Sequence, residues 1–174
     1  TWEEEANAFV GGAIFTNTYT STGTLSGATE LVVEKTFTGR ENDMWTENDT
    51  FTFTLTGSDG SPMPAGSNGN VKTITVGADD VTNGVHANHF GDIIYTTADN
   101  GKAYTYTIEE TAGNVYGVTY SKASYTVTVK VFDNDDGTLD IDKTMTQTTD
   151  DKGASDGIAQ NPTVAAFANT YDVP

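Results

Sequence analysis

Apolar residues alternate with Thr, Ser or charged residues at a period of two in almost every apolar stretch of this chain. Such alternation is typical of β-strands with one buried face, because successive side chains point to opposite sides of a strand. No stretch keeps the 3.6-residue apolar period of a helix over the roughly 11 residues needed to identify one. The chain is therefore predicted to be all-β. The expected strands cover residues 30–38, 49–57, 71–77, 92–97, 103–110, 123–132, 137–146 and 163–171.

The segments between these strands are rich in Gly, Pro, Asn and Asp, which favour tight turns. Examples are GSDGSPMPAGSNGN at residues 57–70 and DNDDGT at residues 133–138. Strands at this spacing predict two packed antiparallel sheets, an immunoglobulin-like two-sheet sandwich. The length of 174 residues fits one such domain with a short additional segment.

The sequence contains an internal repeat, A-x-F-x-N-T-Y, which occurs near both ends of the chain. Its two asparagines, Asn17 and Asn169, are 152 positions apart (169 − 17), about the length of one domain. The repeat therefore predicts two successive domain endings, and neighbouring repeats of the same polypeptide are the expected partners. We expect residues 1–19 to be the terminal strand of a preceding repeat and residues 20–29 to be a small polar linker. Residues 30–174 are expected to form one domain.

Three polar residues lie on strand faces that are otherwise apolar. Strand parity places Lys35, Glu110 and Asn169 on the inward faces of the first strand, the strand at 103–110 and the last strand. Because a buried ion is costly unless it is paired or neutralised, these residues require an explanation. One explanation is that they reach water at strand ends or form a buried ion pair with an amide nearby. The other is that they form a reaction centre.

The reaction that these groups suit is transamidation. Burial lowers the pKa of an amine and raises that of a carboxyl group, so a proton can pass from Lys35 to Glu110. The neutral amine would attack Cγ of Asn169, while Glu110 polarises the carboxamide and passes a proton to the departing ammonia. The expected product is a Lys–Asn isopeptide bond. Glu109 is the alternative acid, although its parity places it on the outer face of the strand.

Several segments, taken in order, resemble the streptococcal pilin isopeptide linkage domains, relatives of the Cna B-type domains of Gram-positive surface proteins. They span residues 30–171 and include LVVEKTFTGR, DTFTFTL, PMPAG, YTYTIEETAG and AAFANTY. The resemblance implies a Cna B-type sandwich with crosslinked first and last strands, in which Lys35 is the nucleophile, Glu110 the proton shuttle and Asn169 the electrophile. It also implies tandem domains that each close with F-x-N-T-Y, so Asn17 would be the crosslink residue of a preceding domain.

The resemblance further implies an extracellular, cell-wall-anchored surface protein. In it this domain would be a structural stalk without enzymatic turnover. The sequence has neither a YPKN-like motif nor LPxTG, which favours a stalk domain of a long adhesin over a pilin polymerised through this domain. The alternative is a ligand-binding module for a glycan or a host-surface protein, carried by the long loops at 57–70, 78–91 or 147–162. An accessory sandwich of a secreted glycoside hydrolase is a more distant alternative.

The charge of the chain is strongly acidic, with 25 Asp and Glu residues against 8 Lys and Arg residues and a net charge of −17 at pH 7. This charge disfavours nucleic acid and anionic membranes as partners. No apolar run of about 18 residues is present, and the first residues, TWEEE, do not resemble a signal peptide, so we expect no membrane insertion and an excerpt of a longer protein. The absence of cysteine excludes disulfides and thiolate metal sites, and no cofactor or metal is expected.

Three further groups of residues require a chemical interpretation. The acidic segment 132–142 lacks a glycine at the sixth position after an initial Asp, so a hairpin turn at Asp136-Gly137 is favoured over a calcium loop. His86 and His89 would need additional ligands to hold a metal, and the sequence assigns none. The two tryptophans are Trp2 and Trp45, for which packing is favoured over a sugar-binding platform.

Overall fold

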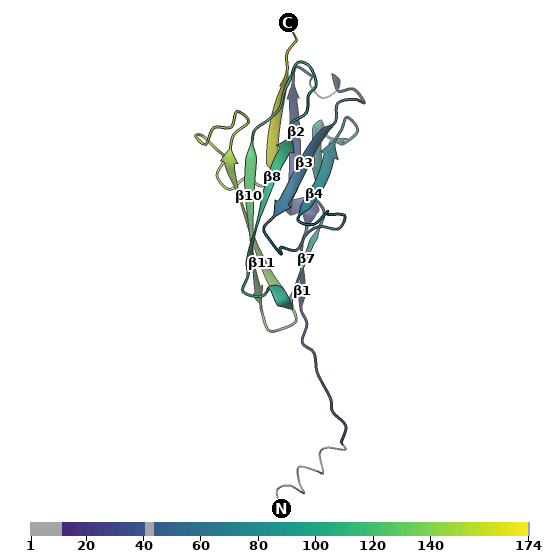
Figure 1. Ribbon diagram of the computed structural model, residues 1–174, viewed down its shortest axis with the longest axis vertical. Helices are drawn as coiled ribbons and strands as arrows, with labels where there is room; N and C mark the ends of the chain where they lie inside the picture. Colours follow the sequence, from purple (N-terminus) through teal and green to yellow (C-terminus); the bar gives the residue numbers. More distant parts are fainter. Residues whose placement is uncertain (1–11, 41–43, 174) are drawn as a thin grey trace, which may run out of the picture.

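The computed structural model describes residues 12–40 and 44–173. The predictions for residues 1–11 and for Trp2 lie outside this part of the chain. The described chain forms one elongated body, and its N-terminal segment and C-terminus leave from opposite ends (Figure 1). None of the helices in this part of the chain is long and apolar enough to span a membrane.

Two five-stranded sheets make up most of the body, in agreement with the expected two-sheet sandwich. In the first sheet the order is β11-β10-β8-β3-β4, and all neighbours are antiparallel. Its strands are β3 (Phe51–Gly57), β4 (Val71–Val76), β8 (Ala103–Thr111), β10 (Ser124–Asp133) and β11 (Leu139–Thr149). In the second sheet the order is β5-β6-β2-β12-β9. Its strands are β2 (Val32–Thr38), β5 (Val81–Thr82), β6 (Val85–His89), β9 (Val118–Thr119) and β12 (Ala165–Tyr171).

The core between the sheets is built mainly from the inward-facing positions of these strands, together with buried residues of the segment 90–95. Its largest fully buried side chains include Tyr95, Tyr106, Phe53, Phe90 and Phe167. The predicted all-β, immunoglobulin-like two-sheet fold is confirmed. Each of the eight expected strands is present in some form, but the segment 78–91, expected to be a loop, contains the short strands β5 and β6.

The first and last long strands of the domain are neighbours. Strand β12 pairs with β2 in parallel, with Phe167 opposite Lys35 and Asn169 opposite Phe37, so the expectation of purely antiparallel sheets is wrong for the second sheet. Parallel neighbours need a long connection, and here almost the whole domain separates them along the chain. This pairing is therefore the reason that residues far apart in sequence meet inside the sandwich (Figure 1).

Residues 20–29, expected to be a linker, include two packed elements. Strand β1 (Thr22–Leu25) pairs with β7 (Ile93–Thr96), and the short helix α2 (Gly27–Glu30) follows it. Gly27 packs so closely that a Cβ there would lie 2.2 Å from the carbonyl oxygen of Gly91. The small residues of this segment thus allow close packing. Composition alone does not distinguish such a packed segment from a flexible linker. A 3-10 helix, η2 (Thr97–Asp99), follows β7.

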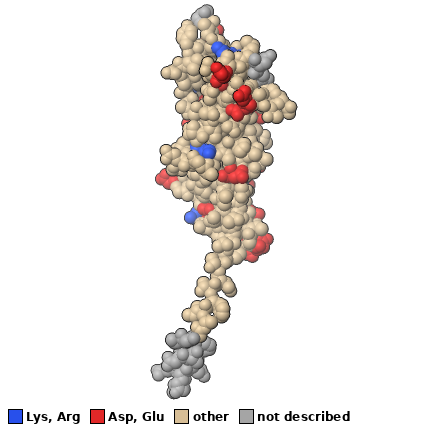
Figure 2. All heavy atoms as spheres, turned by 90° about the vertical axis from the view of Figure 1, so that its right-hand side faces the viewer, with Lys and Arg blue, Asp and Glu red and all other residues tan. Residues whose placement is uncertain are grey.

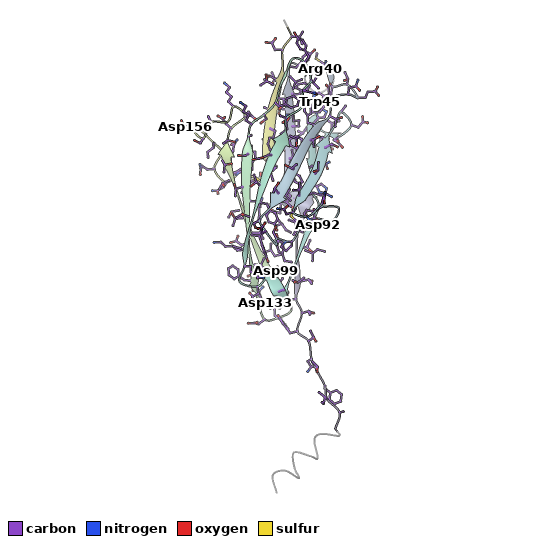
Figure 3. All side chains as sticks on the ribbon, in the orientation of Figure 1. Arg40, Trp45, Asp92, Asp99, Asp133 and Asp156 are labelled. Atoms are coloured by element: carbon purple, nitrogen blue, oxygen red, sulfur yellow. The ribbon has the colours of Figure 1, made fainter. Side chains whose placement is uncertain are left out.

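The acidic residues on one face of the molecule do not form a single patch (Figure 2). On the face shown in Figure 2, Asp and Glu side chains are scattered over the body rather than gathered in one patch. Arg40 and Trp45 lie toward the end that carries the C-terminus, whereas Asp99 and Asp133 lie toward the end from which the N-terminal segment leaves (Figure 3). These two ends are referred to below as the C-terminal end and the N-terminal end.

Candidate functional site: a buried amine, carboxyl and carboxamide

The three inward polar residues predicted from strand parity come together between the sheets. Lys35 on β2 and Asn169 on β12 belong to neighbouring strands of the second sheet, and Glu110 on β8 faces them from the first. Lys35 is 4% exposed and Asn169 is 0% exposed, while the side chain of Glu110 is fully buried. The interpretation in which these residues reach water at strand ends is therefore wrong.

A single carboxyl group joins the other two side chains. Lys35 Nζ donates a hydrogen bond to Glu110 Oε2 at 2.8 Å, and Asn169 Nδ2 donates one to Glu110 Oε1 at 2.5 Å. Each oxygen of the carboxyl group thus serves one of the two groups that transamidation would join. Glu109, the alternative acid, is exposed on the opposite face of β8.

The carbonyl oxygen of the carboxamide has a partner that the sequence did not predict. The backbone N–H of Ser121 donates to Asn169 Oδ1 at 2.7 Å. Because a backbone N–H can only donate, the carboxamide atom facing Ser121 is the oxygen, and the nitrogen Nδ2 faces Glu110. The orientation of the Asn169 side chain is therefore defined by its hydrogen bonds on both sides.

Asp151 holds the Ser121 segment and β12 in place. Its Oδ1 accepts hydrogen bonds from Ser121 Oγ at 2.5 Å and from the backbone N–H of Ala168 at 2.9 Å. Ser121 Oγ also accepts a hydrogen bond from the N–H of Ala123 at 3.1 Å. Asp151 lies in the polar segment 147–162, expected to be a surface excursion, and no spacing or motif distinguishes it there.

Aromatic rings surround the amine and keep water away from it. Lys35 Nζ lies 4.6 Å from the centre of the Phe51 ring and 6.0 Å from that of Phe53. Trp45 packs edge-on against Phe51 with ring centres 5.3 Å apart, and it is 9% exposed. Trp45 is thus part of the core and offers no sugar-binding platform.

Burial brings the pKa values of Lys35 and Glu110 closer together. Desolvation lowers the pKa of the Lys35 amine to about 8, although the neighbouring Glu110 carboxylate opposes the shift. Desolvation also raises the pKa of Glu110, against the opposing charge and hydrogen bond of Lys35. Because burial disfavours both charged forms, the site makes it easier for a proton to pass from the amine to the carboxyl group.

The remaining candidate residues lie outside this cluster. Asn17 is exposed and lies in a segment without assigned strand structure. The hairpin expected at Asp136-Gly137 joins β10 to β11, and Gly137 has the positive φ of 89° that such turns require. Within residues 12–40 and 44–173 no group of three or more His, Cys, Asp or Glu side chains is arranged to hold a metal.

The two histidines differ in environment. His86 is 1% exposed and stacks on Trp45 with ring centres 3.8 Å apart, and neither of its ring nitrogens has a hydrogen-bond partner in the described part of the chain. His89 is exposed, and its Nδ1 accepts a hydrogen bond from the N–H of Gly91 at 3.2 Å.

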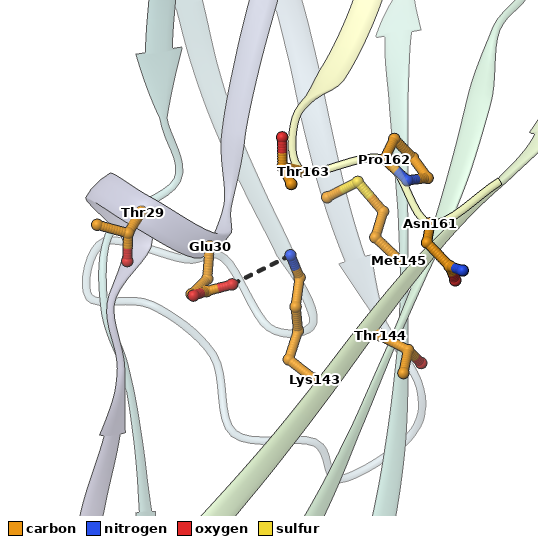
Figure 4. Close-up of a pocket in the computed structure, with 8 residues that line it drawn as sticks. All are labelled: Thr29, Glu30, Lys143, Thr144, Met145, Asn161, Pro162 and Thr163. Atoms are coloured by element: carbon orange, nitrogen blue, oxygen red, sulfur yellow. Dashed lines mark ion pairs between the residues drawn. The ribbon is translucent and has the colours of Figure 1, made fainter. Parts of the chain in front are cut away.

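A surface cavity of about 400 Å³ lies between α2, β11 and residues 161–163 (Figure 4). Its lining includes the ion pair between Glu30 and Lys143, at 3.2 Å. The cavity contains none of the three clustered residues, so it is separate from the site described above.

Comparisons with known proteins identify one matching family and several similar structures. A family model described as "FctA: Spy0128-like isopeptide containing domain" matches residues 31–172. No curated protein matched the sequence. Among solved structures, the T-13 major pilin of Streptococcus pyogenes is 17% identical with a TM-score of 0.49, and the T3.2 major pilin of the same species is 19% identical with a TM-score of 0.46. Each alignment covers 86% of this chain and 54% of the pilin, so the chain spans about half the length of these structures.

Proposed function

Because the chain belongs to the FctA family of Spy0128-like isopeptide-containing domains, we propose that it is a structural stalk domain locked by an isopeptide bond between Lys35 and Asn169. The observation that carries this proposal is the buried Glu110 carboxyl group, which binds the amine with one oxygen and the carboxamide with the other. The bond forms once in each molecule, so the domain has no diffusible substrate and needs no cofactor.

The proposed reaction begins with the passage of a proton from the Lys35 ammonium to Glu110. The neutral Nζ attacks Cγ of Asn169, and negative charge develops on Oδ1, where the Ser121 N–H already donates a hydrogen bond. Glu110 then gives its proton to Nδ2, the Cγ–Nδ2 bond breaks and ammonia leaves. Glu110 takes up the proton that Nζ loses as the new amide forms, and that proton leaves with ammonia as ammonium.

Folding lowers the barrier to this slow reaction because it holds the reacting groups in place. Amide aminolysis is very slow in water, but holding the reactants in place can contribute about 7 to 11 kcal/mol toward the barrier. A donor placed at the developing oxyanion contributes about 3 kcal/mol more. The rings of Phe51 and Phe53 keep water out of the site. In such a site transfer of the proton to Glu110 is more favourable, and the hydrogen bond to the developing oxyanion is stronger.

The bond would stabilise the domain against heat and force. It closes a loop of about 134 residues (169 − 35), and the chain-entropy relation used for disulfides gives roughly 5 kcal/mol for such a loop. Because it joins β2 to β12, a pulling force would pass from one strand to the other and bypass most of the domain. An amide also resists reduction, unlike a disulfide.

We extend the proposal to the neighbouring part of the polypeptide. The repeated A-x-F-x-N-T-Y supports a preceding repeat that ends with the segment containing Asn17, whose own crosslink partner would lie in that repeat. The packing of β1 supports a domain that starts near Ser21 rather than at residue 30. We further propose that the parent is an extracellular, cell-wall-anchored adhesin or pilus-like protein of a Gram-positive bacterium.

Intact-protein mass spectrometry tests the crosslink. The folded chain should weigh about 17 Da less than its sequence, the mass of one ammonia, because transamidation releases that molecule. The Glu110→Ala variant should recover the full mass, whereas Glu109→Ala, on the exposed face of the same strand, should keep the loss. An unshifted mass in the folded wild-type protein would rule the proposal out.

A further inference from the structure

The segment just before β1 is bound to the N-terminal end of the domain. The Tyr19 hydroxyl donates a hydrogen bond to Asp133 Oδ1 at 2.7 Å and accepts one from the N–H of Gly137 at 3.1 Å. The backbone N–H of Ser21 donates to Thr97 Oγ1 at 2.6 Å, and Ser21 is only 2% exposed. Tyr19 therefore contacts the turn between β10 and β11, which covers residues 134–138. This turn follows Asp133, which Figure 3 labels at the N-terminal end of the body.

Tyr19 is also the last residue of the first A-x-F-x-N-T-Y, and its counterpart in the second is Tyr171 at the end of β12. In this domain the Tyr171 ring packs against its own repeat, 4.5 Å from the Arg40 guanidinium and 6.2 Å from the centre of the Phe37 ring. By that equivalence the ring of Tyr19 belongs to the preceding repeat. Its hydroxyl, however, is bound to this one.

The distance available between the two repeats is short. Only Thr20 and Ser21 separate Tyr19 from β1, and the three Cα steps from Tyr19 to Thr22 span at most about 11 Å. A linker of this length cannot hold two domains apart, so their ends must meet. Since Ser21 is buried and hydrogen-bonded, the joint has little freedom to rotate.

The C-terminal end of the domain has the surface that such contact would cover. Val115 and Tyr116 are 57% and 76% exposed, and they lie beside the exit of β12, where the N–H of Asp172 donates to the carbonyl oxygen of Gly117 at 2.9 Å. A group of apolar side chains exposed beside a chain exit is typical of an interaction surface. Figure 1 shows that this exit lies at the opposite end from the N-terminal segment, as an end-to-end array requires.

We propose that the β10–β11 turn, through Asp133 and Gly137, is the docking site for the tyrosine that ends the preceding repeat. Successive repeats then meet end to end in a stiff joint, in which the surface around Val115 and Tyr116 faces the N-terminal end of the next repeat. This inference rests on the proposed function, because it takes the segment of Asn17 as the end of a preceding repeat. The tyrosine acts at once as packing for its own repeat and as a hydrogen-bonding group for the next.

The docking contact is testable in the chain as it stands. The Tyr19→Phe variant loses the hydroxyl that accepts the Gly137 N–H, so exchange of that amide, measured by NMR, should become about fivefold faster, the factor for one ordinary hydrogen bond. Thr18→Val is the matched control, because Thr18 is the exposed neighbour of Tyr19 and its replacement also removes a hydroxyl, and it should leave the Gly137 amide unchanged. Equal exchange in wild type and Tyr19→Phe would overturn the proposal.

A linked pair tests the joint itself. Joining residue 171 directly to residue 20 of a second copy recreates the Tyr-Thr-Ser connection. Amide exchange over residues 115–117 of the first copy should then slow relative to the single chain, and six Gly and Ser residues inserted at the junction should restore it. Unchanged exchange in the directly joined pair would refute the joint. The mass of each protein distinguishes the two proposals. Normal ammonia loss without slower exchange over residues 115–117 refutes only the joint. Slower exchange there without ammonia loss refutes only the crosslink.

Discussion

The response of the domain to a pulling force is the sharpest test of what the crosslink does. With Lys35 bonded to Asn169, about 134 residues (169 − 35) lie inside a covalent loop and cannot be extended. At ~3.5 Å for each extended residue, this protected chain is on the order of 470 Å long. Only the short segment 21–34, which holds β1 and α2, remains between the joint and Lys35, and its full extension is roughly 50 Å.

The perturbation is Glu110→Gln, which keeps nearly the same shape and a hydrogen-bonding group beside Asn169 but cannot take a proton from Lys35. Without the bond, force should unfold the domain and release on the order of 470 Å of chain in one step. Asn169→Ala is a second variant, which removes the electrophile and leaves the Lys35–Glu110 ion pair intact.

The assay is single-molecule force spectroscopy with the chain held near its two ends. Wild type should show no unfolding step longer than the roughly 50 Å available from residues 21–34, and both variants should show the long step. Glu109→Gln is the control and should behave as wild type. A long step in wild-type molecules whose mass shows the ammonia loss would refute the argument that force bypasses the domain.

Three further predictions concern stability and rate. Glu110→Ala should lower the free energy of unfolding by roughly 5 kcal/mol, seen as a lower melting temperature, and equal melting temperatures would contradict the loop-closure argument. In Asn169→Ala, which cannot crosslink, Lys35 should keep the lowered pKa of about 8 that burial gives it in the folded chain, against 10.5 when unfolded, so the unfolded state should bind more protons between these values. Its stability should therefore rise by up to about 3 kcal/mol from pH 8 to pH 10.5 in denaturant titrations, and the rise should be smaller when Lys35→Met is added. Ser121→Pro removes the N–H that faces Oδ1 and should slow the loss of ammonia after refolding about 100-fold or more, whereas Ser121→Ala, which keeps that N–H, should slow it far less.

Strand parity was enough to place Lys35, Glu110 and Asn169 on inward faces, and the structure brings these residues together. The same reasoning could not find Ser121, because its contribution is a backbone N–H that every residue except proline possesses. It could not find Asp151 either, since an aspartate in a polar loop has no periodic pattern to mark it. Small residues such as those of segment 20–29 suit both flexible chains and tight packing. The sequence therefore predicts a linker where the structure has β1 and α2.

The sequence by itself thus determined the properties that repeat locally. The alternation of side chains sets the strands, their buried faces and the inward position of each reactive group, because neighbours along a strand point to opposite sides whatever the rest of the chain does. Only the tertiary structure decided which of these groups meet. The contacts of Glu110 join residues 75 and 59 positions away, and their distances depend on the parallel pairing of β2 with β12 and on the packing of the two sheets. The same is true of Tyr19, whose bond to Asp133 spans 114 positions and depends on the pairing of β1 with β7 and on the bridge between Thr22 and Thr138.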